Sequence, residues 1–167
     1  MKTKFLIILL TFVTIFFIAC DEDSITEAVL GSNSITLSGD ITDSFDAPAF
    51  GGLSVEDSMF IVTMSPNFNS QVYENILLLG LETATLPEVR TYNVGVDEMN
   101  QNEFRAIFTR NDSTTYMMSS GTVKITSSSS SKIEGTFDMK GPLFSFDQTG
   151  DSELIIKGEF STTPIIE

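Results

Sequence analysis

Carboxylates are the most abundant ionisable side chains in this sequence. The 167 residues include 23 Asp and Glu against 9 Lys and Arg, which gives a formal net charge of -14 at pH 7. Asp40, Asp43 and Asp46 recur at every third position, and Asp147 and Asp151 flank a Thr-Gly pair. Carboxylate oxygens are the usual ligands of calcium, and weak calcium sites are common in extracellular modules. The spacing matches neither an EF-hand loop nor a calcium-binding repeat. Solvated loop acids are therefore the favoured interpretation, and a calcium site is the alternative.

Histidine chemistry is missing altogether. The sequence has no His and a single Cys, so it holds no Ser-His-Asp or Cys-His machinery, imidazole metal site or cysteine cluster. Glycoside hydrolysis would need two carboxylates about 5 to 10 Å apart across a cleft, and nothing in the sequence singles out such a pair. We therefore expect no enzyme activity, no cofactor and no resident metal. Scattered bases on an acidic chain also exclude a nucleic-acid partner, because phosphate binding needs clustered positive charge.

The first twenty residues, MKTKFLIILLTFVTIFFIAC, have the layout of an export signal. Two lysines precede an apolar stretch from Phe5 to Ile18, which is followed by Ala19 and Cys20. A basic start, an apolar run and a small residue before the cleavage point are the parts of a secretory signal peptide. As a helix the apolar run spans about 21 Å, short of the roughly 30 Å hydrocarbon core. A signal peptide over residues 1–19 is expected rather than a membrane-spanning helix.

Cys20 is the only cysteine, and it directly follows Ala19 at the end of the apolar run. The segment Phe17-Ile18-Ala19-Cys20 resembles the lipobox of bacterial lipoproteins, in a loose form similar to that of Bacteroidetes. The resemblance implies lipid attachment at Cys20 and a membrane anchor, because each buried methylene of an acyl chain contributes about 0.8 kcal/mol. A plain secretory signal with an incidental cysteine is the alternative.

An acidic cluster, Asp21-Glu22-Asp23, follows Cys20 at once. Such a cluster resembles the surface-export signal of Bacteroidetes lipoproteins, which implies display on the outer face of the outer membrane. In the alternative, the carboxylates only keep a tether solvated and extended, and the protein faces the periplasm. We interpret residues 20–33 as an acidic tether and residues 34–167 as one folded domain.

From Ser34 onward apolar residues recur at every second position, which is the period of a half-buried strand. Two runs, Met59 to Met64 and Ile76 to Leu81, are apolar on both faces. They are expected to be central strands covered on both sides, or strands beneath a loop. At most one short helical turn is expected, where Ser54 and Asp57 have a capping-box spacing. The pattern predicts an all-β domain, an antiparallel sandwich or barrel of about eight or nine strands. The expected strands lie at 35–42, 59–64, 76–81, 91–96, 104–109, 115–119, 121–126, 133–140 and 154–160.

The C-terminal third carries a recurring phrase of short motifs. They are SGTVKIT at Ser120–Thr126, IEGTF at Ile133–Phe137 and KGEF at Lys157–Phe160. This rhythm resembles a family of small Bacteroidetes lipoproteins of unknown function, over roughly residues 34–162. The resemblance implies an immunoglobulin-like or barrel-like body and no particular activity.

The ligand or partner stays open at this stage. Sugar binding by stacking uses exposed aromatic rings, yet there is no Trp, and only Tyr73, Tyr92 and Tyr116 accompany the 14 Phe. Three triplets resemble the O-glycosylation acceptor of Bacteroidetes, with chance as the alternative: Asp23-Ser24-Ile25, Asp57-Ser58-Met59 and Asp112-Ser113-Thr114. We expect a lipid-anchored envelope protein with a binding or structural role. The alternative is a calcium-assisted carbohydrate- or protein-binding module at the cell surface.

Overall fold

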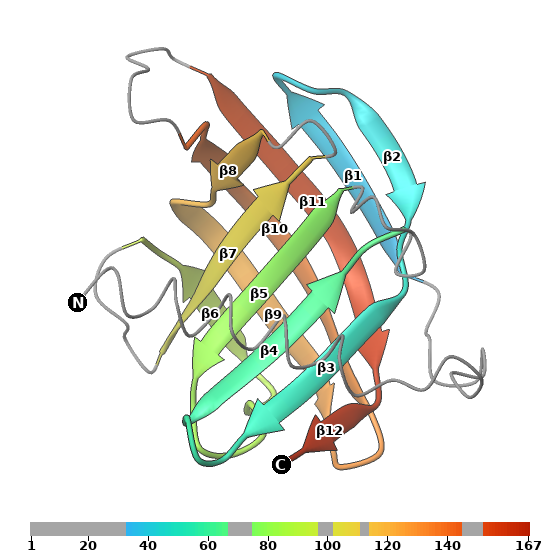
Figure 1. Cartoon of the computed structure of the whole chain (residues 1–167), viewed down its shortest axis with the longest axis vertical. Coiled ribbons are helices and arrows are strands. Elements are labelled where there is room, and N and C mark those ends of the chain that lie inside the picture. The colour runs from blue at the N-terminus through green and yellow to red at the C-terminus, as the bar shows by residue number, and fades with distance from the viewer. Residues whose placement is uncertain (1–32, 67–74, 97–101, 111–113, 145–151) are drawn as a thin grey trace.

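The computed structural model describes residues 33–66, 75–96, 102–110, 114–144 and 152–167. Every regular element within these ranges is a β-strand, so the expected all-β class is confirmed for this part of the chain (Figure 1). The strands are β1 (Ser34–Gly39), β2 (Asp43–Asp46), β3 (Ala49–Ser54), β4 (Met59–Met64), β5 (Ile76–Glu82), β6 (Thr91–Val94), β7 (Glu103–Thr109), β8 (Thr115–Met117), β9 (Ser120–Ser128), β10 (Ile133–Pro142), β11 (Glu153–Thr162) and β12 (Pro164–Ile166).

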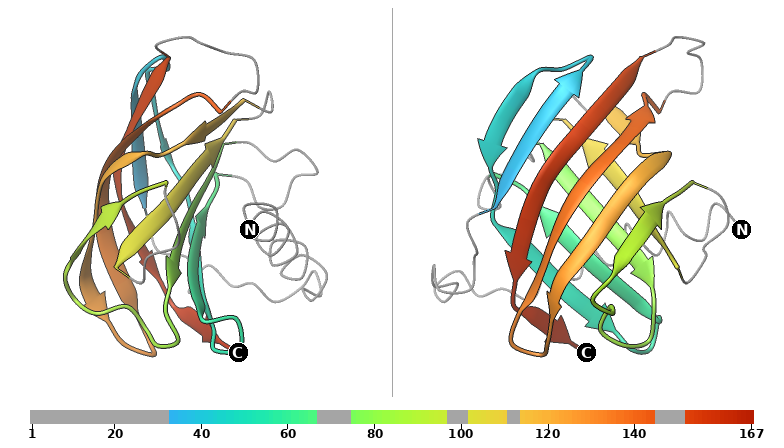
Figure 2. Two further views of the ribbon diagram at one scale, coloured as in Figure 1. Left: turned by 90° about the vertical axis from the view of Figure 1, so that its left-hand side faces the viewer. Right: turned by 180° about the vertical axis from the view of Figure 1, so that it is seen from behind.

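All of these strands belong to one continuous 12-stranded sheet. Its order is β12-β3-β4-β5-β7-β6-β9-β10-β11-β1-β2, and β8 pairs with β7 off this path. The pairs β12–β3 and β6–β7 are parallel, and the others are antiparallel. The sheet curls over, so that β3, β4, β5 and β7 face β9, β10, β11 and β1 across the interior (Figure 2). We call these two groups the front half and the back half; β6 joins them.

The C-terminal strand ties the back half to the front half. After Thr162, β11 leads into β12, which pairs with β3 from Gly51 to Leu53. Glu167 extends this pairing, since its N–H donates to Leu53 O and its own carbonyl accepts from Val55 N, both at 3.0 Å. Gly51 allows the close approach, because a Cβ at this position would overlap the side chain of Thr162.

The concave face of the curled sheet is the hydrophobic core. Alternation along the strands is as predicted: on β10, Ile133, Phe137 and Met139 are buried, whereas Thr136 and Asp138 are exposed. The largest fully buried side chains come from both halves. They are Phe60, Phe104, Phe108, Ile35, Leu37, Met64, Leu77, Leu79, Leu81, Met118, Ile125 and Ile133. Burying one such side chain contributes about 1.5 to 3 kcal/mol, so the shared core holds the two halves together.

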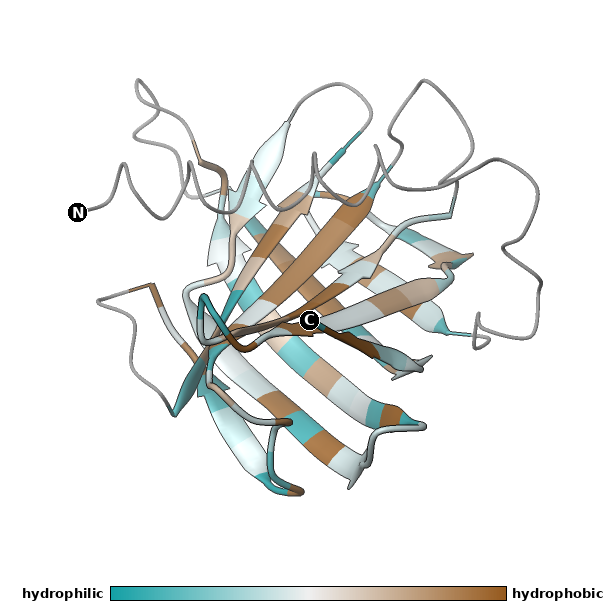
Figure 3. Cartoon of the chain, turned by 60° about the horizontal axis from the view of Figure 1, so that its bottom comes forward, coloured by the Kyte–Doolittle hydropathy of each residue, from teal (hydrophilic) through white to brown (hydrophobic). Residues whose placement is uncertain are grey.

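Strands β4 and β5 are buried on both faces, as their two-sided apolar runs indicated. Their inward residues join the main core, while Met59, Ile61 and Leu78 form a second buried cluster with the partly buried Ile107. We call these four residues the outer apolar cluster, because they lie on the convex face of the front half. Burial is nearly continuous along β4 and β5 and alternates along β10. Figure 3 shows the same contrast in hydropathy between uniformly brown strands and banded ones.

The strand count differs from the prediction. All nine expected strands are present, to within a few residues, but the described chain has twelve strands instead of eight or nine. The unexpected ones are β2, β3 and β12. A Gly-Gly pair weakens a strand and indicates a break, yet Gly51 in β3 makes room for the side chain of Thr162 at the end of β11. β2 and β12 are short edge strands rich in acids or opened by proline, which is typical of sheet edges.

The capping-box spacing before β4 marks a hydrogen-bonded turn. The Asp57 N–H donates to Ser54 Oγ at 3.2 Å, and the Ser54 hydroxyl donates to Asp57 Oδ2 at 3.0 Å. Ser58 has a φ of 52°, and its carbonyl accepts from Thr83 N at 2.8 Å. The chain reverses here into β4 within the turn that links β3 and β4.

Gly121 provides a test of this packing. Its φ is +123°, and a Cβ would overlap the backbone of Asp138 and Met139 on β10. Strain and overlap together predict that Gly121→Ala lowers the free energy of unfolding by at least about 2 kcal/mol in urea. The matched control is Gly80→Ala, where a Cβ meets only Met59 Sδ at 3.9 Å. That variant should stay within about 0.5 kcal/mol of the parent, and equal losses in the two variants would contradict the packing.

Candidate functional site

The chain enters the body at Asn33, which is only 1% exposed. Its side-chain nitrogen donates to Ala47 O at 3.1 Å, and its side-chain oxygen accepts from Ser161 N at 2.5 Å. The Asn33 carbonyl also accepts from Ala47 N at 2.9 Å. One residue thus fastens the base of the expected tether to the β2–β3 connection and to the end of β11. We call this arrangement the Asn33 clamp.

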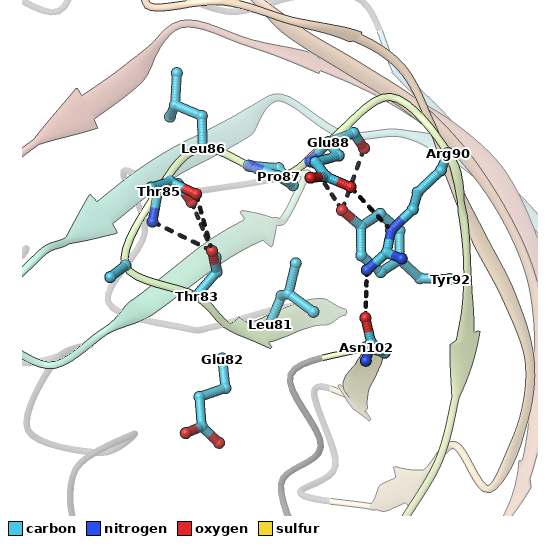
Figure 4. A pocket seen from close by; sticks show the side chains of 11 residues that line it. Leu81, Glu82, Thr83, Thr85, Leu86, Pro87, Glu88, Arg90, Tyr92 and Asn102 are labelled. Atoms are coloured by element: carbon cyan, nitrogen blue, oxygen red, sulfur yellow. Dashed lines mark hydrogen bonds and ion pairs between the residues drawn. The ribbon is translucent and has the colours of Figure 1, made fainter.

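A pocket of about 470 Å³ lies where the chain crosses from β5 to β6 (Figure 4). The connecting loop supplies most of its lining, and Tyr92 and Asn102 complete it. Tyr92 is 3% exposed, and its ring meets that of Phe104 edge to face, with centroids 5.3 Å apart. Its hydroxyl accepts from Glu88 N at 2.8 Å and donates to Glu88 O at 3.2 Å. Tyr92 therefore fixes the β5–β6 loop to the start of β6.

Arg90 lies over the outer side of the same ring, with its guanidinium carbon 4.3 Å from the Tyr92 centroid. It donates to Asn102 Oδ1 at 2.6 Å, and its Nε is 3.7 Å from Glu88 Oε2. The pKa of Arg90 is raised above its ordinary value, first by hydrogen bonding with Tyr92 and further by the nearby Glu88. The polar groups of this pocket thus bind one another, an arrangement that stabilises the β5–β6 crossing.

The structure does not bring the described candidates for the alternative calcium site together. Asp40 accepts a hydrogen bond from the Ser152 hydroxyl, and Asp43 Oδ1 accepts from Ser44 N at 2.8 Å. Asp46 is also exposed, at the end of β2. Within the described ranges there is no group of three or more His, Cys, Asp or Glu residues that could hold a metal ion. Asp147 and Asp151 lie outside those ranges.

Two strand acids of the back half, Asp138 and Glu153, pair with lysines. Lys157 Nζ lies 2.7 Å from Asp138 Oδ2, and Lys140 Nζ lies 3.1 Å from Glu153 Oε2. These partners are all around half exposed, and exposed pairs of this kind contribute about 0 to 1 kcal/mol. They form a wet outer face on β10 and β11, opposite in character to the outer apolar cluster.

Several predicted site residues fall outside the described residues. They are Cys20 with the signal peptide and acidic cluster, Tyr73, and the acceptor positions Ser24 and Ser113. Of the acceptors, Ser58 is described and is partly exposed in the β3–β4 turn. No helix in the described part of the chain is long and apolar enough to cross a membrane.

Sequence reasoning missed the Asn33 clamp and the Arg90–Tyr92 contact. Asn33 was assigned to the end of the acidic tether, after Gly31-Ser32. Its hydrogen-bond partners, Ala47 and Ser161, are distant in sequence, so no local pattern indicates them. Tyr92 was noted only as a candidate for stacking on sugar, whereas its ring is buried beneath Arg90. Leu86-Pro87, shortly before β6, is the local sequence signal for a rigid β5–β6 loop.

Comparison with known proteins returns no relationship. No protein-family model matches the chain, and no curated protein or solved structure matches it. A functional interpretation therefore depends on the residues and contacts described above.

The Asn33 clamp yields a stability prediction. Asn33→Ala removes the acceptor of Ser161 N and the donor to Ala47 O at a buried position. It should lower the free energy of unfolding by about 1 to 3 kcal/mol, measured by urea titration. Asn93→Ala, at an exposed position of β6, is the matched control and should change stability by less than about 0.5 kcal/mol. Similar losses in both variants would refute the clamp.

The hydrogen bonds of the Tyr92 hydroxyl yield a second stability prediction. Tyr92→Phe keeps the ring contacts and removes both hydrogen bonds to Glu88, so it should cost about 0.5 to 1.5 kcal/mol of unfolding free energy. Hydrogen exchange at the Glu88 amide should accelerate at the same time, which separates loss of the loop contact from a general loss of stability. An unchanged exchange rate at Glu88 would show that the hydroxyl does not hold the loop.

Proposed function

We propose that the protein is exported behind a signal peptide of residues 1–19 and anchored by lipid on Cys20 in the outer membrane. The observation that carries the proposal is the placement of the single cysteine. Cys20 ends an apolar run, directly follows Ala19 and precedes an acidic tether. An exported protein with one free thiol is otherwise unusual, and lipid attachment gives that thiol a role. The membrane is then a partner of this protein through the acyl chains.

The all-β body serves as a binding or structural element of the cell envelope in this proposal. Two features of the described chain support such a role. The Asn33 clamp gives the tether a buried, hydrogen-bonded root, which suits a body held from one end. The acids on β10 and β11 form ion pairs with lysines, an arrangement that favours a stable surface over acid–base chemistry.

Lipid attachment is tested by mass. The full-length gene is expressed in a bacterial host, and the intact protein is analysed from the membrane fraction. We expect a chain that starts at Cys20 and carries the added mass of acyl chains. Cys20→Ser should abolish the added mass and leave a chain that keeps residues 1–19, because lipid is attached before cleavage, while Ser24→Ala should leave both the added mass and the cleavage unchanged. An unmodified thiol on Cys20 in the membrane-bound parent protein would overturn the proposal.

We further propose that the acidic cluster directs the protein to the cell surface. Protease added to intact cells of a Bacteroidetes host should then degrade the parent protein. Neutralising the cluster, as Asp21→Asn, Glu22→Gln and Asp23→Asn together, should protect the protein inside the cell. Asp43→Asn with Asp46→Asn removes acids from the exposed β2 instead and should leave the protein accessible. Full protection of the parent protein would support the periplasmic-facing alternative and overturn surface display.

A further inference from the structure

The outer apolar cluster is buried although no described element covers it. Met59 and Ile61 are each 6% exposed and Leu78 is 8% exposed, on the convex face of β4 and β5. Within the described ranges every strand belongs to the one curled sheet, and none lies in front of this face (Figures 1 and 2). Apolar side chains on the outside of a single sheet need a covering layer to stay away from water.

A cationic group lies beside the cluster. Arg105 on β7 pairs with Gly80 and points to the convex face, because its neighbours Phe104 and Ala106 enter the core. Its Nε is buried and has no hydrogen-bond partner in the described part of the chain. A buried N–H of a charged group without an acceptor is costly. The layer over this face should therefore supply an acceptor, and a carboxylate would be the strongest one.

We propose that residues 25–30 of the acidic tether, ITEAVL, dock on the convex face of the front half. Ile25, Ala28, Val29 and Leu30 then cover the outer apolar cluster, and the tether carboxylates, Glu27 foremost, face Arg105. The inference rests on the proposed cleavage after Ala19, which leaves the tether as the N-terminal segment of the mature chain.

The tether is rooted at the correct edge of the sheet. Asn33 bonds to Ala47, two residues before β3 begins at Ala49. β4 and β5 follow β3 directly in the sheet, so they lie about 5 and 10 Å from it at the usual strand spacing. The farthest member of the cluster, Met59, pairs with Ser54, which lies seven residues beyond Ala47, or about 23 Å along the strand. The chain from Ile25 to Asn33 spans up to about 26 Å when extended. Its reach therefore covers the whole cluster.

The charge of the tether distinguishes it from the signal peptide. The apolar run Phe5 to Ile18 would also cover an apolar face, but it contains no carboxylate. The tether combines apolar residues with Asp21, Glu22, Asp23 and Glu27. Of these two N-terminal segments, the tether is the one that matches both the apolar cluster and the guanidinium of Arg105.

Cross-linking in the full chain tests the docking. Thr26→Cys is combined with Thr63→Cys on β4, whose partly buried side chain lies on the convex face beside the cluster. The matched control combines Thr26→Cys with Thr136→Cys, on the outer face of β10 in the back half. Membranes are treated with a short bismaleimide, and the linked peptides are identified by mass spectrometry. Docking predicts an intramolecular link to position 63 with a yield at least about ten-fold above that to position 136.

Other outcomes would overturn the proposal. Equal yields at the two positions would mean a tether that does not dock, as would no link at either position. A link between two chains at position 63 would assign the face to a second copy, and a link found only in uncleaved protein would assign it to the precursor. Replacing residues 1–19 by an ordinary cleavable secretory signal in the Cys20→Ser background keeps this test separate from lipid attachment. That chain carries no lipid but still begins with the tether, so the preference for position 63 should persist.

Discussion

An apolar inner face has to be buried, and a single sheet can bury it only by curling over itself. This requirement organises the protein. Phe60 and Leu79 on the front half and Ile125 and Ile35 on the back half share one core, although their strands are far apart in the sheet order. Burial of about 1.5 to 3 kcal/mol per large side chain outweighs any single surface contact, including the lysine–carboxylate pairs of β10 and β11. The other features keep the curled sheet in this arrangement or exploit its outer faces.

Three local arrangements hold the two halves of the curled sheet together. β6 joins the halves by pairing with β7 on one side and β9 on the other, and the Tyr92 hydroxyl fixes the loop that leads into it. β12 bridges from the end of β11 to β3. The Asn33 clamp connects the start of β1 to the same region through Ala47 and Ser161. Because each arrangement involves a buried or paired polar group, losing one leaves an unsatisfied partner as well as a missing bond.

The period of two in the apolar residues, together with the two-sided apolar runs at 59–64 and 76–81, was enough to predict nine strands and the inward set on β10. It was not enough for β3, where Gly51-Gly52 indicates a break locally but serves a close contact with Thr162 that forms only in the folded sheet. The sequence pattern also does not specify which strands pair. The continuity of the sheet was therefore not predicted, nor were the parallel pairs β12–β3 and β6–β7. Asn33 and Arg90 were missed for the same reason, since their partners are brought near by the tertiary fold. The acids at 40, 43 and 46 show the reverse case, in which a regular spacing along the chain produces no cluster in space.

The two outer faces differ in a way that the core does not require. The back half presents Asp138, Lys140 and Lys157 to water. The convex face of the front half carries the outer apolar cluster and Arg105, with Glu82 and Glu103 where β5 ends and β7 begins. A sheet stabilised by its core alone would be expected to have polar residues on both convex faces, because an exposed apolar patch promotes association. The two-sided apolar runs of β4 and β5 are visible in the sequence, so the sequence itself specifies that the two convex faces differ. A tether rooted at Asn33 and docked on that face would fix the position of the body relative to its membrane anchor. The polar back half would then be the surface presented to the surroundings.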